Sequence, residues 1–257
     1  MLKILHISPQ PKEVARKRQQ QGMDVGELLT GHFRSWMQSL TLETIFTEDR
    51  VPSREELKAA DGVVISGSVL SVYQENLPWM EELQQLIRAA LAEHVPMLGI
   101  CFGHQAISQA LGGNVALGKD GKEAGVIRVS RSEKEYQDPL FDQVPHEFHA
   151  SSVHADAVVR LPQTPGFEVR VLAASRKYIQ SLAIGDNVRT AQFHPEFDTR
   201  TLDLLLESEF HPDEIELDQA VDRDKVVDTG RQILRNFLMY FVQRRRAEIS
   251  ARQKKVL

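Results

Sequence analysis

The one cysteine of the chain stands where a turn would expose a nucleophile. Cys101 follows the apolar run Pro96-Met-Leu-Gly-Ile and lies between Gly99 and Gly103, the pattern of a strand that turns sharply into a helix. Such a turn directs the sulfur out of the path of the chain, and the free N–H groups of the following helix favour a thiolate. Cysteines more often serve as small buried apolar side chains, so this pattern alone leaves a packing role open.

A histidine and a carboxylate with suitable chemistry follow later in the chain. Residues 187–193 form a strand-like run that leads into His194, and Glu196 lies two residues further on. A histidine can accept the proton of a thiol and pass it to a leaving amine, while a carboxylate on its other nitrogen holds the ring in one tautomer. Cys101, His194 and Glu196 are therefore predicted to form a complete catalytic triad.

These two motifs resemble those of the class I glutamine amidotransferases. Gly99-Ile-Cys101-Phe-Gly-His-Gln105 matches the nucleophile motif of that family position by position, and His194-Pro-Glu196 matches its second motif. The likeness covers roughly residues 60–200 and is greatest to the stand-alone members and to the amidotransferase domain of GMP synthase. It implies an α/β fold, a three-layer sandwich with a mostly parallel, flavodoxin-like central sheet.

The resemblance also implies an oxyanion hole. Ser66-Gly67-Ser68 follows a predicted strand, at the sheet edge where open α/β sheets bind their ligands. The family takes one backbone N–H from a glycine-containing turn at this place, a role that we assign to Gly67, and the N–H of Phe102 is the second donor. Both matter because the tetrahedral intermediate concentrates charge on one oxygen, and losing one donor costs about 10²–10³ in rate.

Three residues are assigned to the substrate by the same likeness. Gln105 lies one helical turn beyond Cys101, and the family uses this glutamine at the amino-acid end of its substrate. Ser151 and Ser152 lie in a stretch that resembles the substrate loop of the GMP synthase type. Val153 stands where that pattern has a serine, so this stretch departs from the family at one position.

His149 and His154 are candidates for two further roles, a catalytic base and a metal ligand. His154 is an alternative base, but it lacks the His-Pro-Glu context, so we expect a structural histidine bonded to Asp156. With His149, His194 and Glu196 these residues have the types that bind zinc. Their spacing contains no helical His-x-x-x-His pair and the triad already accounts for two of them, so neither a metal nor another cofactor is predicted.

The implied reaction is hydrolysis of the side-chain amide of glutamine through a γ-glutamyl thioester on Cys101, which releases glutamate and ammonia. The chain has no ATP-binding signature such as Gly-x-x-x-x-Gly-Lys-Ser/Thr, so an ammonia-accepting synthetase would be a separate partner chain. One alternative is a stand-alone γ-glutamyl peptidase or hydrolase with the same triad, which needs more room for its leaving group. Another is a non-enzymatic scaffold that keeps the pocket, which would have an unreactive thiol.

Composition argues against several other classes of protein. The 257-residue chain has a formal net charge of −5, which gives no support for nucleic acid or an acidic membrane surface as a partner. A single cysteine rules out an internal disulfide framework. The first residues lack the apolar length and the cleavage site of a signal peptide, and no run reaches membrane-spanning length, so a cytoplasmic location is expected.

The hydrophobic pattern predicts a single domain over residues 1–257. Before Cys101 it predicts strands at 2–7, 42–47 and 62–66, helices at 24–40, 53–61 and 78–94, and a loop or marginal helix at 12–21. Residues 113–191 are rich in short strands, which indicates an antiparallel extension of the sheet. From about residue 200 the chain diverges from the family, with helices at 199–209 and 226–246, an acidic connection at 211–224 and a basic, frayed tail.

Overall fold

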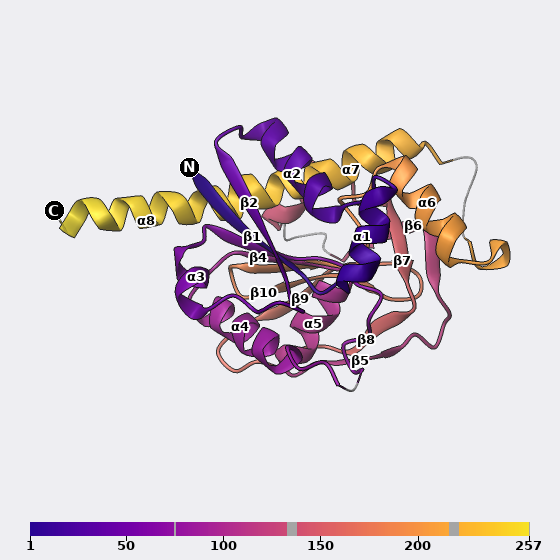
Figure 1. Ribbon diagram of the computed structural model, residues 1–257, viewed down its shortest axis with the longest axis horizontal. Coiled ribbons are helices and arrows are strands. Elements are labelled where there is room, and N and C mark those ends of the chain that lie inside the picture. The colour runs from indigo at the N-terminus through magenta and orange to yellow at the C-terminus, as the bar shows by residue number, and fades with distance from the viewer. Residues whose placement is uncertain (75, 133–137, 216–220, 257) are drawn as a thin grey trace.

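The centre of the fold is a mixed β-sheet covered by helices on both faces (Figure 1). The computed structural model describes residues 1–74, 76–132, 138–215 and 221–256. Within these residues the main sheet has nine strands in the order β2-β1-β3-β4-β11-β10-β9-β6-β7. The neighbouring parallel strands are β2 (Leu40–Phe46), β1 (Leu2–Ser8), β3 (Gly62–Ile65), β4 (Met97–Ile100) and β11 (Val188–Ala191).

Side chains of the parallel strands alternate between two apolar cores, as the period of a strand requires. On β1, Ile4 packs into one core and Leu5 into the other. The first core is covered by α2 (Val25–Trp36) and α7 (Arg223–Asn236), and the second by α3 (Arg54–Ala59), α4 (Met80–Ala92) and α5 (Phe102–Ala110). The three-layer sandwich with a mostly parallel, flavodoxin-like sheet is therefore confirmed.

The antiparallel extension predicted from the strand-rich stretch is also present. It consists of β10 (Ile179–Ile184), β9 (Val169–Ala174), β6 (Glu123–Arg131) and β7 (Glu147–His154). A separate antiparallel pair is formed by β5 (Asn114–Leu117) and β8 (Asp156–Arg160). Because β8 begins two residues after β7 ends, the chain passes from the large sheet to the small pair at Ala155.

Near the N-terminus the structure decides one open alternative and corrects one prediction. Residues 12–20, expected to form a loop or a marginal helix, form the helix α1 (Lys12–Gln20). Helix α2 begins after its cap Asp24, as predicted, but it ends at Trp36 instead of continuing to Leu40. Leu40 keeps the helical spacing and yet is the first residue of β2, because its side chain is buried in the same core as its strand neighbour Leu2.

The C-terminal part is helical, with α6 (Thr199–Glu209) at its predicted bounds. Helix α7, the π-helical turn η3 (Phe237–Val242) and α8 (Gln243–Val256) follow one another, and α8 extends beyond the body of the molecule (Figure 1). The tail predicted to be frayed is therefore helical to Val256. Residues 216–220 of the acidic connection lie outside the described residues. None of the described helices combines the length and the apolar character needed to cross a membrane.

Candidate functional site

Cys101 lies at a strained turn between β4 and α5. Its N–H donates to the Ala191 carbonyl (2.8 Å) and its carbonyl accepts from the Gln105 N–H (3.1 Å), so the residue belongs to both the sheet and the helix. Its torsion angles, φ 50° and ψ −102°, lie in a region that residues with a Cβ rarely adopt. This is the strained turn expected of a nucleophile elbow, and the side chain lines a cleft at the carboxyl end of β4.

The two flanking glycines allow close packing around this turn. A Cβ on Gly99 would lie 2.5 Å from Ile107 Cδ1, and a Cβ on Gly103 would lie 2.2 Å from the Ile65 carbonyl oxygen. Neither glycine has a positive φ, so the unusual torsion angles fall on Cys101 itself. The glycines instead let α5 lie directly against β3 and β4, which places the N-terminus of the helix next to the sulfur.

His194 and Glu196 form a buried pair just beyond the end of β11. Strand β11 lies next to β4 in the sheet, with Ala191 paired to Ile100, so the two strands deliver His194 and Cys101 to the same edge. His194 Nδ1 lies 2.8 Å from Glu196 Oε1, and the carboxylate is fully buried. A carboxylate that accepts from Nδ1–H leaves the other ring nitrogen free to exchange a proton.

The charge on His194 suits proton transfer to a leaving amine. Burial acts to lower the pKa of the ring, but the Glu196 carboxylate and Cys101 outweigh it and raise the pKa of His194 from 6.5 to about 10. The ring is therefore protonated at neutral pH. The ring of Phe197 stacks on it with centroids 4.1 Å apart and planes 6° apart, which limits rotation of the imidazole.

Gly67 and Phe102 both lie next to the side chains of the candidate triad. Gly67 follows β3, and a Cβ there would lie 2.9 Å from His194 Cε1 and 3.5 Å from Cys101 Cβ. Phe102 is the first residue of α5, where a backbone N–H has no partner within the helix. The structure thus brings together the two backbone segments that the family resemblance assigned to an oxyanion, and their role as donors stays a prediction.

The sulfur opens on a cleft with a volume of about 370 Å³. Loop residues 67–71 and 73 and segment 153–156 border it near Cys101, and Arg18 and Glu209 form an ion pair further along. Ser71 Oγ and Tyr73 Oη donate to the two carboxylate oxygens of Asp156, at 2.6 and 2.7 Å. Sequence reasoning missed Ser71 and Tyr73, because nothing in a strand pattern shows which distant loop will meet Asp156.

Gln105 reaches the cleft, as expected for the residue one turn beyond Cys101. Its side-chain Nε2 is already used within the protein, where it donates to the Asp156 carbonyl (3.0 Å) and to Gln192 Oε1 (3.2 Å). The described contacts of Gln105 therefore tie α5 to the cleft wall, and direct contact with a substrate remains a prediction.

Ser151 and Ser152 do not meet the cleft. Both side chains are buried and neither lines it, because both residues still lie inside β7, whereas the cleft begins where this strand ends. Ser151 instead contributes its backbone carbonyl, which accepts from the His194 N–H at 2.8 Å. The next residues, 153–156, border the cleft, and the substrate-binding role assigned to Ser151 and Ser152 stays a prediction.

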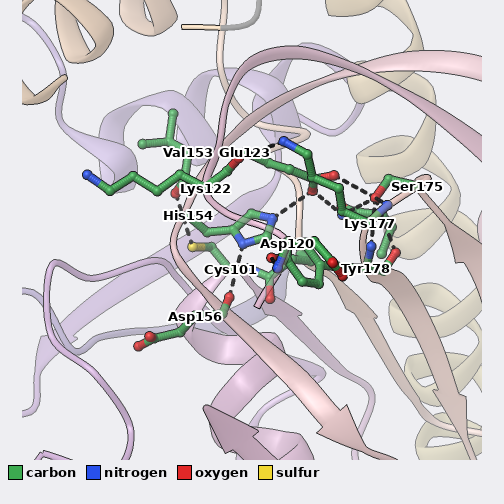
Figure 2. Close-up of polar contacts among 12 residues, drawn as sticks. Cys101, Asp120, Lys122, Glu123, Val153, His154, Asp156, Ser175, Lys177 and Tyr178 are labelled. Carbon is green, nitrogen blue, oxygen red and sulfur yellow. Dashed lines mark hydrogen bonds and ion pairs between the residues drawn. The ribbon is translucent and has the colours of Figure 1, made fainter. Parts of the chain in front are cut away.

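His154 is held as a structural residue. Its Nδ1 lies 3.0 Å from the backbone carbonyl of Asp156, not from the carboxylate, and its Nε2 lies 2.9 Å from Glu123 Oε2 (Figure 2). With both nitrogens engaged, this ring is not placed to serve as the base for Cys101. Among the described residues, no three His, Cys, Asp or Glu side chains converge as the ligands of a metal ion would.

Comparison with known protein families agrees with the two motifs. Residues 23–211 match the family described as glutamine amidotransferase class-I, which is well over half of the chain. The chain belongs to the class I glutamine amidotransferase family. Members of this family are enzymes.

Similar proteins include members with different names. A GMP synthase (glutamine-hydrolyzing) from Thermotoga sp. (strain RQ2) is 31% identical over 175 residues, which cover 68% of this chain and 31% of the relative. Gamma-glutamyl peptidase 4 from Arabidopsis thaliana is 32% identical over 149 residues, 57% of each chain. The chain thus spans about a third of the length of the GMP synthases that it matches.

Solved structures show the same fold. A crystal structure of a glutamine amidotransferase from Thermotoga maritima superposes with a TM-score of 0.70 and 24% sequence identity, and the match covers 94% of this chain and 98% of the other. The fold is therefore shared along nearly the whole chain.

The motif around Cys101 also contains a buried neutral histidine. His104 Nδ1 lies 2.7 Å from Thr190 Oγ1, and burial, reinforced by the charge of His154, lowers the pKa of His104 to about 3. Because the unfolded chain binds this proton near pH 6.5, the contribution of His104 to stability is complete above pH 6.5 and is lost as the pH falls toward 3.

His104→Asn removes this titration and keeps a donor toward Thr190. We expect the free energy of unfolding to fall less between pH 7 and pH 5 in the variant than in the wild type, by about 2 kcal/mol. Urea unfolding at the two pH values measures the difference. An equal pH dependence in both proteins would show that His104 is not a buried neutral ring.

Glu196→Gln is expected to lower kcat about 10³–10⁴-fold. The amide can present N–H instead of an acceptor to Nδ1, which favours the wrong tautomer, and it removes the charge that raises the pKa of His194. Steady-state kinetics with glutamine measure the effect. Glu207→Gln is the matched control, because it removes an exposed carboxylate outside the cleft. A similar loss in both variants would contradict the assigned role.

Proposed function

We propose that this chain hydrolyses the γ-glutamyl C–N bond of glutamine with Cys101 as the nucleophile. One observation carries the proposal: the thiol lies at a strained turn beside a buried histidine whose Nδ1 lies 2.8 Å from the buried Glu196 carboxylate. A positive ring beside the sulfur stabilises a thiolate, and the same ring holds the proton that a leaving amine requires. This arrangement supports acyl transfer to sulfur at neutral pH.

In the first half of the reaction, the Cys101 thiolate attacks the γ-carbonyl carbon and forms a tetrahedral intermediate. Its oxyanion would accept hydrogen bonds from the backbone N–H groups of Gly67 and Phe102. His194 gives its proton to the amide nitrogen, the C–N bond breaks, ammonia leaves, and a γ-glutamyl thioester remains. Glu196 keeps the ring oriented through this transfer.

In the second half, water replaces ammonia in the cleft. His194, now neutral, accepts a proton from this water as its oxygen attacks the thioester carbonyl. The C–S bond then breaks, and glutamate leaves while the Cys101 thiolate and the charged His194 are restored. Each turnover consumes one water and one glutamine and needs no redox partner.

The ammonia would be received by a separate synthetase chain. The GMP synthases that resemble this chain are about three times as long as the matching part, since the match covers 31% of their length. An ammonia-consuming synthetase would bind near the mouth of the cleft. In this proposal the chain supplies ammonia and the partner supplies the acceptor.

The size of the cleft supports a second candidate, hydrolysis of γ-glutamyl peptides. A volume of about 370 Å³ falls in the range of sites that hold drug-sized ligands, and ammonia needs only a small part of it. A larger amine would lie on the His194 side, bordered by Phe197, Leu205 and Glu209. The similarity to a gamma-glutamyl peptidase agrees with this candidate.

Glutamate release from glutamine and from a set of γ-glutamyl dipeptides separates the two candidates. A higher kcat/KM for glutamine supports the amidotransferase, and a higher value for dipeptides supports the peptidase. Mass spectrometry of acid-quenched reactions should detect a γ-glutamyl adduct on Cys101 even where turnover awaits a partner chain. If neither substrate gives release or adduct, the hydrolytic proposal is wrong and a binding scaffold remains.

A further inference from the structure

The wall of the cleft beside the sulfur is a corner between two sheets. The Val153 carbonyl lies 3.7 Å from Cys101 Sγ. Strand β7 of the large sheet ends at His154, and β8 of the separate pair begins at Asp156. Residues 153–156, here called the corner, thus belong partly to each sheet, and their position against Cys101 depends on what holds His154.

Glu123 holds His154 from the interior. It is the first residue of β6 and lies directly opposite His154 in the antiparallel register. Its Oε2 lies 2.9 Å from His154 Nε2, while His154 Nδ1 lies 3.0 Å from the Asp156 carbonyl. Neither a carboxylate nor a carbonyl can donate, so a ring that satisfies both contacts donates from both nitrogens and carries a positive charge.

Burial makes the two charges depend on each other. The side chains of His154 and Glu123 are 1% and 3% exposed. Removing one partner of such a pair leaves the other as an uncompensated charge in a medium of low polarity. The ring of His154 is also packed edge-on against Tyr178, with centroids 5.7 Å apart, so it has little freedom to find another partner.

The carboxylate of Glu123 is fixed in turn by two further donors. Ser175 Oγ donates to Oε1 at 2.6 Å, and Gln180 Nε2 donates to Oε2 at 2.7 Å. Figure 2 shows the contacts of Glu123 with His154 and Ser175. Ser175 follows β9 and Gln180 lies in β10, so one carboxylate joins β6, β7 and the β9–β10 turn. The proposed chemistry uses none of these groups.

We infer that Glu123 is a positioning residue, which acts through His154 to hold the corner where the γ-glutamyl group of the substrate binds against Cys101. This inference rests on the proposed function, because the corner matters to a substrate only if the cleft binds one. The carboxylate does not touch the reacting atoms. Glu123 fixes the position of the corner, and the position of the corner in turn determines how tightly the substrate binds.

Glu123→Met keeps the length of the side chain and removes its acceptors. We expect KM for glutamine, or for the preferred γ-glutamyl dipeptide, to rise about 10²-fold, the scale of a displacement of about 1 Å, while kcat falls less than about threefold. Alkylation of Cys101 by iodoacetamide should keep its rate, because the reagent needs the sulfur and not the corner. Glu123→Gln, whose amide oxygen still accepts, should recover most of the KM.

Asp138→Leu is the matched control. Asp138 is another buried carboxylate, paired with Arg189 at 2.9 Å, and neither residue lines the cleft. The Asp138→Leu variant should lower the stability of the protein, as Glu123→Met does, but leave KM unchanged. Ser175→Ala removes one donor from the Glu123 carboxylate and is a milder variant for the case that Glu123→Met fails to fold. Its expected rise in KM is about fivefold.

Amide hydrogen exchange tests the positioning without any substrate. Exchange across residues 150–160 should be faster in Glu123→Met or Ser175→Ala than in the wild type, and unchanged in Asp138→Leu. If the wild type gives neither turnover nor adduct, the proposed function is wrong. The exchange experiment needs no substrate, so it still tests whether Glu123 positions the corner. Unchanged KM in an active enzyme, or unchanged exchange at the corner, overturns the role of Glu123.

Discussion

Cys101→Ala is expected to reduce glutamate release by at least about 10⁴-fold and to leave the fold intact. Alanine also has a Cβ, so the torsion angles at this position strain it about as much as they strain cysteine. The substitution removes one sulfur atom that borders the cleft, so the free energy of unfolding should change by less than about 1 kcal/mol. Urea unfolding and a glutamate assay measure the two quantities.

The same variant also identifies the covalent intermediate. Because Cys101 is the single cysteine of the sequence, a thioester can form at one position. An acid-quenched wild-type sample should carry the mass of one γ-glutamyl group, and the alanine variant should carry none. Full activity in the alanine variant, or an adduct that persists in it, would rule out Cys101 as the nucleophile.

Gly103→Ala is expected to destabilise the protein by about 3 kcal/mol. The new Cβ would lie 2.2 Å from the Ile65 carbonyl oxygen and 2.9 Å from the Ile65 carbonyl carbon, and these backbone atoms cannot turn aside as a side chain can. Helix α5 must then move away from β3, against a gain of about 1 kcal/mol in helix propensity. Phe102 moves with the helix, so kcat measured on the folded fraction should also fall.

Gly31→Ala, in another helix, is expected to have the opposite effect on stability. Gly31 lies in α2, and a Cβ there meets no atom within 4 Å. Alanine should therefore stabilise the protein by about 0.5–1 kcal/mol and leave catalysis unchanged. Denaturant unfolding of the two variants side by side is the measurement. If both alanines had the same effect, the packing of α5 on β3 would not be the reason for glycine at position 103.

The candidate reacting residues could be predicted because each motif is local in the sequence. Cys101 has its glycines two residues away on each side, and Glu196 lies two residues from His194. The cleft wall could not be predicted in the same way. Glu123 and His154 are 31 residues apart in the chain, and their contact depends on the register of β6 with β7, which no local pattern specifies.

Errors in the predicted fold occur where hydrophobic spacing is ambiguous or absent. Leu40 fits both a helix and a strand, and its pairing with Leu2 decides for the strand. In α8 the apolar period disappears, so the tail was expected to fray. Its arginine, lysine, glutamate, glutamine and alanine residues are nevertheless good helix formers, and Arg244 and Glu248 pair at 3.0 Å one turn apart.

The adjacency of β4 and β11 also sets the order in which a newly made chain becomes reactive. The two strands are neighbours in the sheet, yet residues 101–187 separate them in the chain. Closing so long a segment has an entropic cost, and contacts of this range form late in folding. During synthesis Cys101 therefore leaves the ribosome long before His194. In unfinished chains the sulfur has no histidine beside it, and the candidate site is assembled only when both strands are in the sheet.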